Sequence, residues 1–105
     1  MVSVREARQR SRFEVLVDDE VVGFVVYHEE DGRVAFPHTE VEPQHEGNGL
    51  GSELVRVALD TARARGQQVL PYCRFVSSYI AKNPDYLDLV PDRDRATFGL
   101  AAVPD

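Results

Sequence analysis

The sequence contains no apolar segment long enough to cross a lipid bilayer. A spanning helix needs about 20 consecutive, mainly apolar residues, and charged residues interrupt this chain well before that length. The amino terminus also lacks the apolar stretch of a secretory signal. We therefore expect neither a membrane protein nor a secreted one, and the expected location is the cytoplasm.

The chain also has little cysteine and no net positive charge. Cys73 is the single cysteine and forms no disulfide within the chain, which agrees with a reducing compartment. The formal net charge of −6 argues against a protein that binds duplex nucleic acid, because Lys and Arg supply most of that affinity. Residues 1–12 are basic, unlike the rest of the chain, because they contain Arg5, Arg8, Arg10 and Arg12 but only one acidic residue. We expect a solvated basic arm there.

The 105 residues are enough for one domain with one hydrophobic core. Runs rich in Val, Phe and Tyr at 13–17, 21–29 and 33–41 are separated by Asp-rich or Asp-Gly turns, which predicts an antiparallel three-stranded meander. Pro37 has no backbone N–H, so the third strand is expected to lie at an edge or to be bulged at this point.

Helical spacing begins after the meander. Apolar residues recur at three- and four-residue intervals from Leu50 onward, which predicts an amphipathic helix that Gly66 ends. A fourth strand at 67–73 and a second helix that ends at Pro84 complete an α/β (α+β) fold class. Residues 91–105 are expected to be a short docking segment or a frayed tail.

Three glycines, Gly47, Gly49 and Gly51, stand directly before the first predicted helix. A P-loop is excluded because no Lys followed by Ser or Thr comes after the last glycine. A dinucleotide fingerprint fits poorly, because the spacing is G-x-G-x-G and an antiparallel meander precedes it. A strand-to-helix loop whose N–H groups, from about Gly47 to Ser52, bind a pyrophosphate fits the spacing and the order of elements. The alternative is a tight turn with incidental glycines.

The stretch VEPQHEGNGLGSELV, from Val41 to Val55, resembles the acetyl-CoA loop of the GNAT N-acetyltransferases, where a [Q/R]-x-x-G-x-[G/A] pattern opens the central helix. The motif HTEV before the loop (His38 to Val41) and the motif P-x-C after it (Pro71 to Cys73) resemble those of a small, single-domain group of GNAT proteins often called YjdJ-like. The resemblance covers about residues 13–90 and implies a minimal GNAT fold. Glu46 stands where the family usually has Arg or Gln, and its carboxylate should oppose pyrophosphate binding unless backbone donors and His45 compensate.

The resemblance also implies the cofactor, acetyl-CoA, and the way it is bound. The third and fourth strands are expected to splay apart, so that the pantetheine arm lies between them and pairs with open backbone groups. The expected cofactor-binding residues are Thr39, Glu40, Val41, Glu46, Gly47, Asn48, Gly49, Leu50, Gly51 and Ser52. No metal site is expected.

Three side chains are candidates for catalysis. On the implied geometry, His38 and Cys73 come from neighbouring strands that flank the thioester. His38 suits a general base because histidine exchanges protons near neutral pH, and the alternative is a half-buried histidine bonded to a neighbouring strand. Three roles are open for Cys73: a nucleophile paired with His38, a proton donor to the departing CoA, or a small buried hydrophobic residue. Tyr79 is a general acid or a core aromatic.

The acceptor is expected to be a primary amine. Ordinary GNAT domains have extra helices between the first strands, and this chain has no room for them, so the acceptor side should be open. A protein lysine, a protein amino terminus and a polyamine all remain candidates. The alternatives to an acetyltransferase are a CoA-binding module with little turnover and a small protein-interaction domain. We expect a monomer or a weak dimer.

Overall fold

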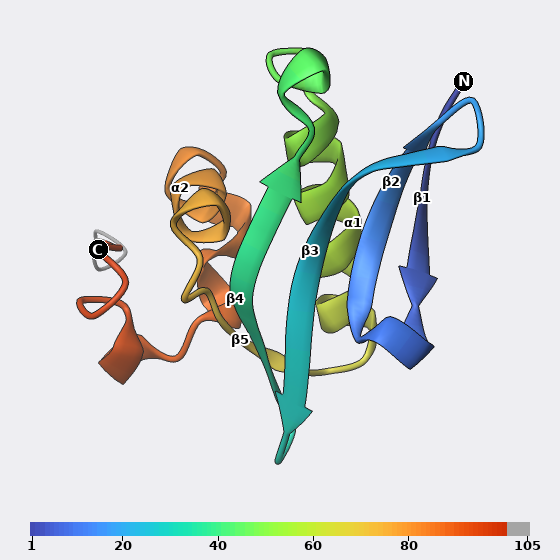
Figure 1. Ribbon diagram of the computed structural model, residues 1–105. Helices are drawn as coiled ribbons and strands as arrows, with labels where there is room; N and C mark the ends of the chain where they lie inside the picture. The colour runs from blue at the N-terminus through green and yellow to red at the C-terminus, as the bar shows by residue number, and fades with distance from the viewer. Residues whose placement is uncertain (101–105) are drawn as a thin grey trace.

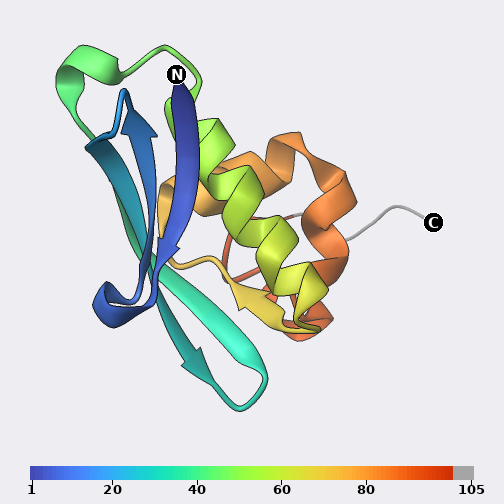
Figure 2. The same cartoon turned by 90° about the vertical axis from the view of Figure 1, so that its right-hand side faces the viewer.

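The computed structural model describes residues 1–100. Five strands form one sheet in the order β1-β2-β3-β4-β5. Both helices lie on the same side of this sheet, which we call the inner face (Figures 1 and 2). The opposite side, the outer face, carries no α-helix in this part of the chain. The strands are β1 (Val2–Ala7), β2 (Arg12–Val17), β3 (Glu20–Glu30), β4 (Arg33–Val41) and β5 (Gln68–Leu70).

The predicted meander is confirmed, and one strand precedes it. Strands β2, β3 and β4 are successive antiparallel neighbours. The prediction of a solvated arm at residues 1–12 is wrong for residues 2–7, because β1 pairs antiparallel with β2 from Val2 opposite Val17 to Ala7 opposite Arg12. A short 3₁₀ turn, Arg8–Arg10, joins the two strands.

The arginines of this amino-terminal segment cover a carboxylate on the outer face. Glu14 on β2 is fully buried and accepts hydrogen bonds from Arg5 at 2.9 Å and Arg12 at 2.8 Å, with Arg10 at 3.4 Å. Burial acts to raise the pKa of Glu14, but the hydrogen bonds from Arg5 and Arg12 outweigh it, and the pKa is lowered. The basic segment is therefore part of the folded sheet.

A β-bulge in β4 decides which side chains reach each face. Val26 lies opposite His38 and His28 opposite Ala35, so Phe36 and Pro37 together face one residue of β3, as Pro37 predicted. Because side chains alternate along a strand, the extra residue exchanges the two faces. Phe36, the first residue of the bulge, is buried in the core on the inner face. After the bulge, Thr39 lies on the inner face and His38 on the outer face.

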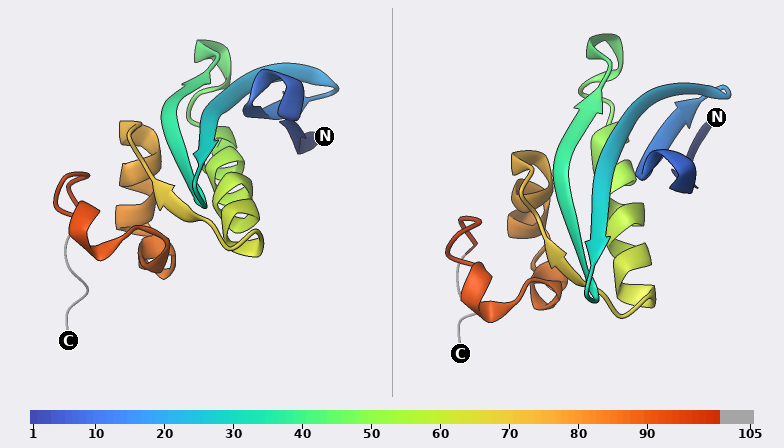
Figure 3. Two further views of the ribbon diagram at one scale, coloured as in Figure 1. Left: turned by 90° about the horizontal axis from the view of Figure 1, so that it is seen from below. Right: turned by 60° about the horizontal axis from the view of Figure 1, so that its bottom comes forward.

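Strands β4 and β5 are parallel and pair over only three residues each, 33–35 with 68–70. The N–H of Cys73 also donates to the carbonyl of Phe36 at 2.7 Å. Beyond this point the strands diverge, which Figure 3 shows from below. The predicted splay is confirmed, and the predicted strand at 67–73 is shorter than expected.

The helices also agree with the predictions. Helix α1 (Leu50–Ala64) buries one face on the sheet, and Gly66, with φ of 67°, follows its end. Helix α2 (Arg74–Lys82) stops before Pro84. Short 3₁₀ segments, Pro43–His45, Pro84–Leu89 and Asp92–Asp94, complete the described elements. No helix in residues 1–100 is long and apolar enough to cross a membrane.

The carboxyl-terminal stretch docks as far as residue 100. Leu100 is buried in the core, and the ring of Phe98 lies edge-on to that of Tyr72, with 5.1 Å between their centroids. Of the two alternatives given for this stretch, these contacts favour a docking segment up to residue 100, and residues 101–105 lie outside the described part of the chain.

Candidate functional site

A cleft of about 1110 Å³ lies between the upper part of β4, the loop after it and the start of α1. Nine of the ten predicted cofactor-binding residues line it; Asn48 does not. The lining residues that we predicted are Thr39, Glu40, Val41, Glu46, Gly47, Gly49, Leu50, Gly51 and Ser52. The three catalytic candidates, His38, Cys73 and Tyr79, are outside this lining.

The side of β4 that faces the splay carries open backbone groups. The N–H of Glu42 donates to Val22 on β3 at 2.8 Å, and the carbonyl of Glu40 also faces β3, since it lies 2.8 Å from a Cβ built on Gly23. Backbone groups alternate in direction along a strand, so those of Thr39 and Val41 point away from β3 into the splay. Thr39 and Val41 therefore offer a strand edge, and the backbone of Glu40 does not.

The glycine loop leads from this edge to the start of α1. Gly47 and Gly49 have φ of 86° and 75°, a conformation that residues with a side chain rarely adopt, and a Cβ on either would meet nothing within 4 Å. No side chain caps the helix at Gly49. The first N–H groups of a helix have no partner within it, so this open loop and helix start form a place for an anion.

Gly51 has a different reason to be glycine. It is buried in the first turn of α1, and a Cβ there would lie 2.5 Å from the ring of Phe75 on α2. What approaches this glycine is therefore a side chain of the protein. Contact with Phe75 is therefore enough to explain glycine at position 51, whereas a Cβ on Gly47 or Gly49 would meet no protein atom within 4 Å.

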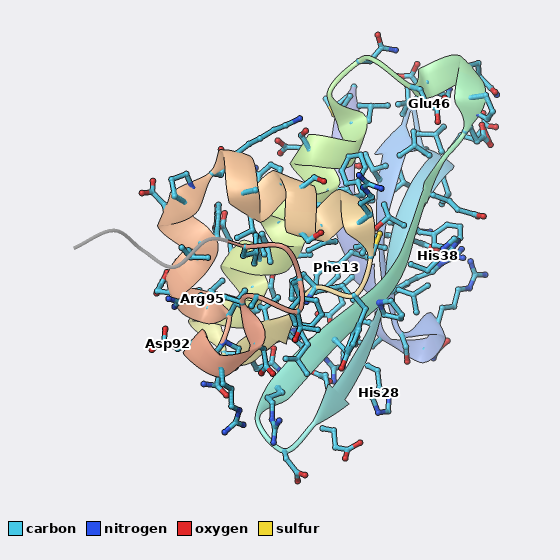
Figure 4. The ribbon with its side chains drawn as sticks, turned by 90° about the vertical axis from the view of Figure 1, so that its left-hand side faces the viewer. Phe13, His28, His38, Glu46, Asp92 and Arg95 are labelled. Carbon is cyan, nitrogen blue, oxygen red and sulfur yellow. The ribbon has the colours of Figure 1, made fainter. Side chains whose placement is uncertain are left out.

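Negative side chains surround the cleft. Glu40, Glu42 and Glu46 line it together with His45 and Arg12. The guanidinium of Arg12 is already held by Glu14 at 2.7 Å and stacks over the ring of Phe24, 4.4 Å from its centroid. Figure 4 shows Glu46 in the loop before α1. This placement keeps Glu46 close to the helix start, where its charge should disfavour an anion.

His38 and Cys73 lie on opposite faces of the sheet, which argues against one of the three roles given for Cys73, that of a nucleophile paired with His38. His38 points away from the helices (Figure 4), with its Nε2 atom 3.1 Å from Glu40 Oε1 and its ring 6.1 Å from that of Phe24. Cys73 precedes α2, and its thiol donates to the hydroxyl of Thr39 at 3.2 Å. The bulge at Phe36 and Pro37 causes this separation, because it moves His38 to the outer face.

Tyr79 belongs to the contact between the helices and the segment after α2. Its ring lies 5.9 Å from that of Tyr86, and burial raises the pKa of Tyr79. Tyr86 donates to Asp60 at 2.7 Å, which raises the pKa of Tyr86 to about 12. This position, outside the cleft, fits a core aromatic better than a general acid.

Three residues near the site were not predicted from the sequence. Arg12, Phe24 and Phe75 line the cleft, although they come from a presumed arm, a strand and the second helix. Arg12 and Phe24 alternate with core residues along their strands, and this alternation could have placed both side chains on the outer face. Nothing in the local pattern brings Phe75 to Gly51.

Comparison with protein families now connects this geometry to a known group. The family model described as GCN5-related N-acetyltransferase matches residues 12–89. The chain belongs to this family. It is an acetyltransferase by family, and acetyl-CoA is the acetyl donor that the family uses. The YjdJ-like subgroup stays a prediction.

Solved structures share the fold of this GCN5-related chain. The solution structure of a GCN5-like protein from Staphylococcus aureus has a TM-score of 0.67 at 18% identity, covering 85% of this chain and 87% of that one. A ribosomal-protein-alanine N-acetyltransferase from Brucella melitensis biovar Abortus 2308 has a TM-score of 0.57 at 22% identity, with coverage of 90% and 62%. N-acetylglutamate synthase from Neisseria gonorrhoeae, complexed with coenzyme A and N-acetyl-glutamate, has a TM-score of 0.58 at 16% identity, with coverage of 78% and 22%. No curated protein sequence matches the chain.

Proposed function

We propose that this chain transfers the acetyl group of acetyl-CoA to a primary amine that approaches from the outer face of the sheet. One observation carries the proposal: the open backbone edge at Thr39 and Val41 leads directly to the uncapped start of α1. An extended arm with amide groups suits the strand edge, and a diphosphate suits the helix start. Acetyl-CoA has both parts in that order.

The residues divide into a donor side and an acceptor side. Thr39 and Val41 would bind the amides of the arm, and the N–H groups from Gly47 to Ser52 would bind the diphosphate. These groups fit because Gly47 and Gly49 leave open space where side chains would stand. His38 lies on the acceptor side, where its contact with Glu40 at 3.1 Å orients the ring.

The proposed reaction is a direct transfer. The amine nitrogen bonds to the acetyl carbon, the carbon–sulfur bond breaks, CoA leaves with the sulfur, and His38 accepts the proton that the amine loses. Cys73 takes no part as a nucleophile with His38 as its base, because the two side chains lie on opposite faces of the sheet.

The experiment that tests donor binding is calorimetric titration with acetyl-CoA of the native protein and of Ser52→Asp. Ser52 is exposed in the first turn of α1, where an acid stabilises a helix but repels a diphosphate. We expect the variant to remain folded and to bind at least tenfold more weakly. Ser52→Ala is the matched control. Equal affinity in all three proteins would overturn the proposed loop.

Ser52→Asp is a more specific test of donor binding than a bulky substitution at Gly49. Because Gly49 has φ of 75°, any side chain there strains the backbone. Lost binding in such a variant would not distinguish a blocked site from a distorted loop.

The second candidate function is CoA binding with little turnover. It is favoured by the three carboxylates around the cleft, Glu40, Glu42 and Glu46, and by the absence of helices over the outer face within residues 1–100. Release of free CoA thiol in the presence of amines decides between the two. Binding without release, without an acetylated amine and without acetylation of Cys73 would favour the binding module.

A further inference from the structure

We propose that a second hollow, on the outer face where β4 and β5 begin to diverge, binds the acceptor, and that the acceptor is a polyamine. This inference rests on the proposed function, since it places the amine beside the reactive end of acetyl-CoA. The hollow has a volume of about 250 Å³ and is separate from the cleft that would take CoA.

The sheet places this hollow next to the end of the splay. Ala35 and Leu70 line it, and they form the last paired positions of β4 and β5 before the strands separate. Tyr72 follows on the same side, and the next residue, Cys73, contacts Thr39 on the inner face. An amine in the hollow would therefore reach the splay from the side opposite to the helices.

The base proposed for the reaction lies on this same face. His38 follows the bulge on β4, and Figure 4 shows His38 and His28 both directed away from the helices, with His28 farther along the sheet. His28 lines the hollow and His38 does not. The acceptor amine would thus lie near His38, and the rest of the molecule would extend toward His28.

The lining suits a methylene chain with positive charge. Ala35 and Leu70 provide an apolar floor, and Tyr72, which is 62% exposed, provides an aromatic ring. Phe98 supports this ring in a nearly perpendicular contact. An exposed tyrosine ring attracts a cation, and an apolar floor favours the carbon chain between two amines.

The far rim of the hollow is acidic on balance. Glu30 and Asp31 supply two carboxylates, and Arg33 supplies one guanidinium. His28 is 3.4 Å from Glu30. Within residues 1–100 no group of three or more His, Cys, Asp or Glu side chains is placed to hold a metal ion. The excess of negative charge at this rim favours a cation, such as a second ammonium group of the acceptor.

The spacing selects the length of the acceptor. Val26 is opposite His38, and Glu30 follows Val26 by four positions on β3, which corresponds to about 13 Å along a strand. A triamine such as spermidine can approach both ends of this path. A short diamine such as putrescine cannot, so the hollow should favour the longer molecule.

The test is an NMR titration of the ¹⁵N-labelled full chain, first with CoA and then with spermidine. CoA carries no acetyl group, so no reaction interferes. We expect CoA to shift the amides of residues 47–52, and spermidine then to shift those of His28, Arg33, Leu70 and Tyr72. Putrescine should bind several-fold more weakly than spermidine.

Two matched variants determine the charge of the bound group. Glu30→Gln should weaken spermidine binding about two- to fivefold, as expected for an exposed charge pair, and Arg33→Gln should strengthen it by a similar factor. The reverse pattern would mean that the rim binds an anionic acceptor and would overturn the proposal. Equal binding of spermidine and of a lysine peptide without a second cation would overturn the distal ammonium site.

The two levels of the proposal fail in different ways. Shifts at residues 47–52 with CoA but none in the hollow with spermidine would overturn the polyamine site and leave acetyl transfer standing. Absence of any shift at residues 47–52 would overturn the CoA site itself, and the acceptor site with it.

Discussion

Glu6, in the first strand, and Arg65, just after the end of α1, form a paired ion contact across 59 residues of sequence, with Nη1 donating to Oε2 at 3.0 Å. Tyr27 on β3 donates to the same carboxylate at 2.7 Å. Glu6 therefore joins the edge strand to the helix and to the middle of the sheet. The hydrogen bond from Arg65 is the main reason that the pKa of Glu6 falls to about 2, against the opposing effect of burial.

The first prediction is that Glu6→Gln lowers the free energy of unfolding at pH 7 by about 1 to 3 kcal/mol. The folded pKa of about 2 lies below the ordinary value of 4.5, so this stabilisation is present above about pH 4.5. It is lost as pH falls toward 2, because the native carboxylate then takes up a proton. Urea unfolding at several pH values should show the two proteins converging near pH 2.

The control is Glu20→Gln, which removes the same charge from an exposed position at the start of β3. We expect a change below about 0.5 kcal/mol at every pH. A similar loss in both variants would mean that net charge, and not the contact with Arg65, sets the effect. In that case β1 would be less firmly attached than the structure indicates.

The second prediction concerns Gly51 and Phe75. Ala at position 51 adds helix propensity of about 1 kcal/mol, but its Cβ would lie 2.5 Å from the end of the Phe75 ring, so this side chain, which is 42% exposed, must turn away. Gly51→Ala should therefore stabilise the native protein less than it stabilises a Phe75→Ala background. Thermal unfolding of the four proteins of this cycle gives the coupling, and additive effects would contradict the contact.

The order of the main elements could be predicted because each has a regular pattern. The runs at 13–17, 21–29 and 33–41 and the helix from Leu50 have strong periodicity and clear turns, and all four appear within a few residues of the structure. Strand β1 was missed because the arginines at positions 5, 8, 10 and 12 resemble a solvated terminus. Glu14, the partner of Arg5, Arg10 and Arg12, becomes recognisable only when β1 and β2 are paired.

The site was harder to predict because it depends on one extra residue. Pro37 indicated a bulge, yet the consequence for the faces of the sheet follows only from the register with β3. Without the shift, His38 would share a face with Phe36. With it, Thr39 takes the position beside Cys73. The glycine loop was easier, since Gly47 and Gly49 need only local backbone geometry.

The third prediction is that Glu46→Gln strengthens acetyl-CoA binding about two- to tenfold at low salt. A carboxylate a few ångströms from a diphosphate costs on the order of 1 kcal/mol in an exposed site, and Glu46 is exposed beside the loop. The gain should shrink as salt rises, because mobile ions screen exposed charges. Calorimetry at two ionic strengths checks both points. Unchanged affinity at low salt would place the diphosphate away from Glu46.

The last prediction distinguishes the role of His38 from that of Cys73. His38→Gln should lower kcat about 100-fold or more, as expected for loss of a general base, without changing the affinity for CoA, because His38 lies outside the cleft lining. Cys73→Ser should keep most of the native rate, since a hydroxyl can still donate to Thr39 in place of the thiol. Steady-state kinetics with the best amine acceptor measures both variants. If Cys73→Ser instead abolishes transfer, and the native protein incubated with acetyl-CoA gains an acetyl group at Cys73 by mass spectrometry, the route passes through the thiol. The acetyl group would then have to pass from Cys73 on the inner face to an amine on the outer face, and the direct transfer proposed with His38 as base would be wrong.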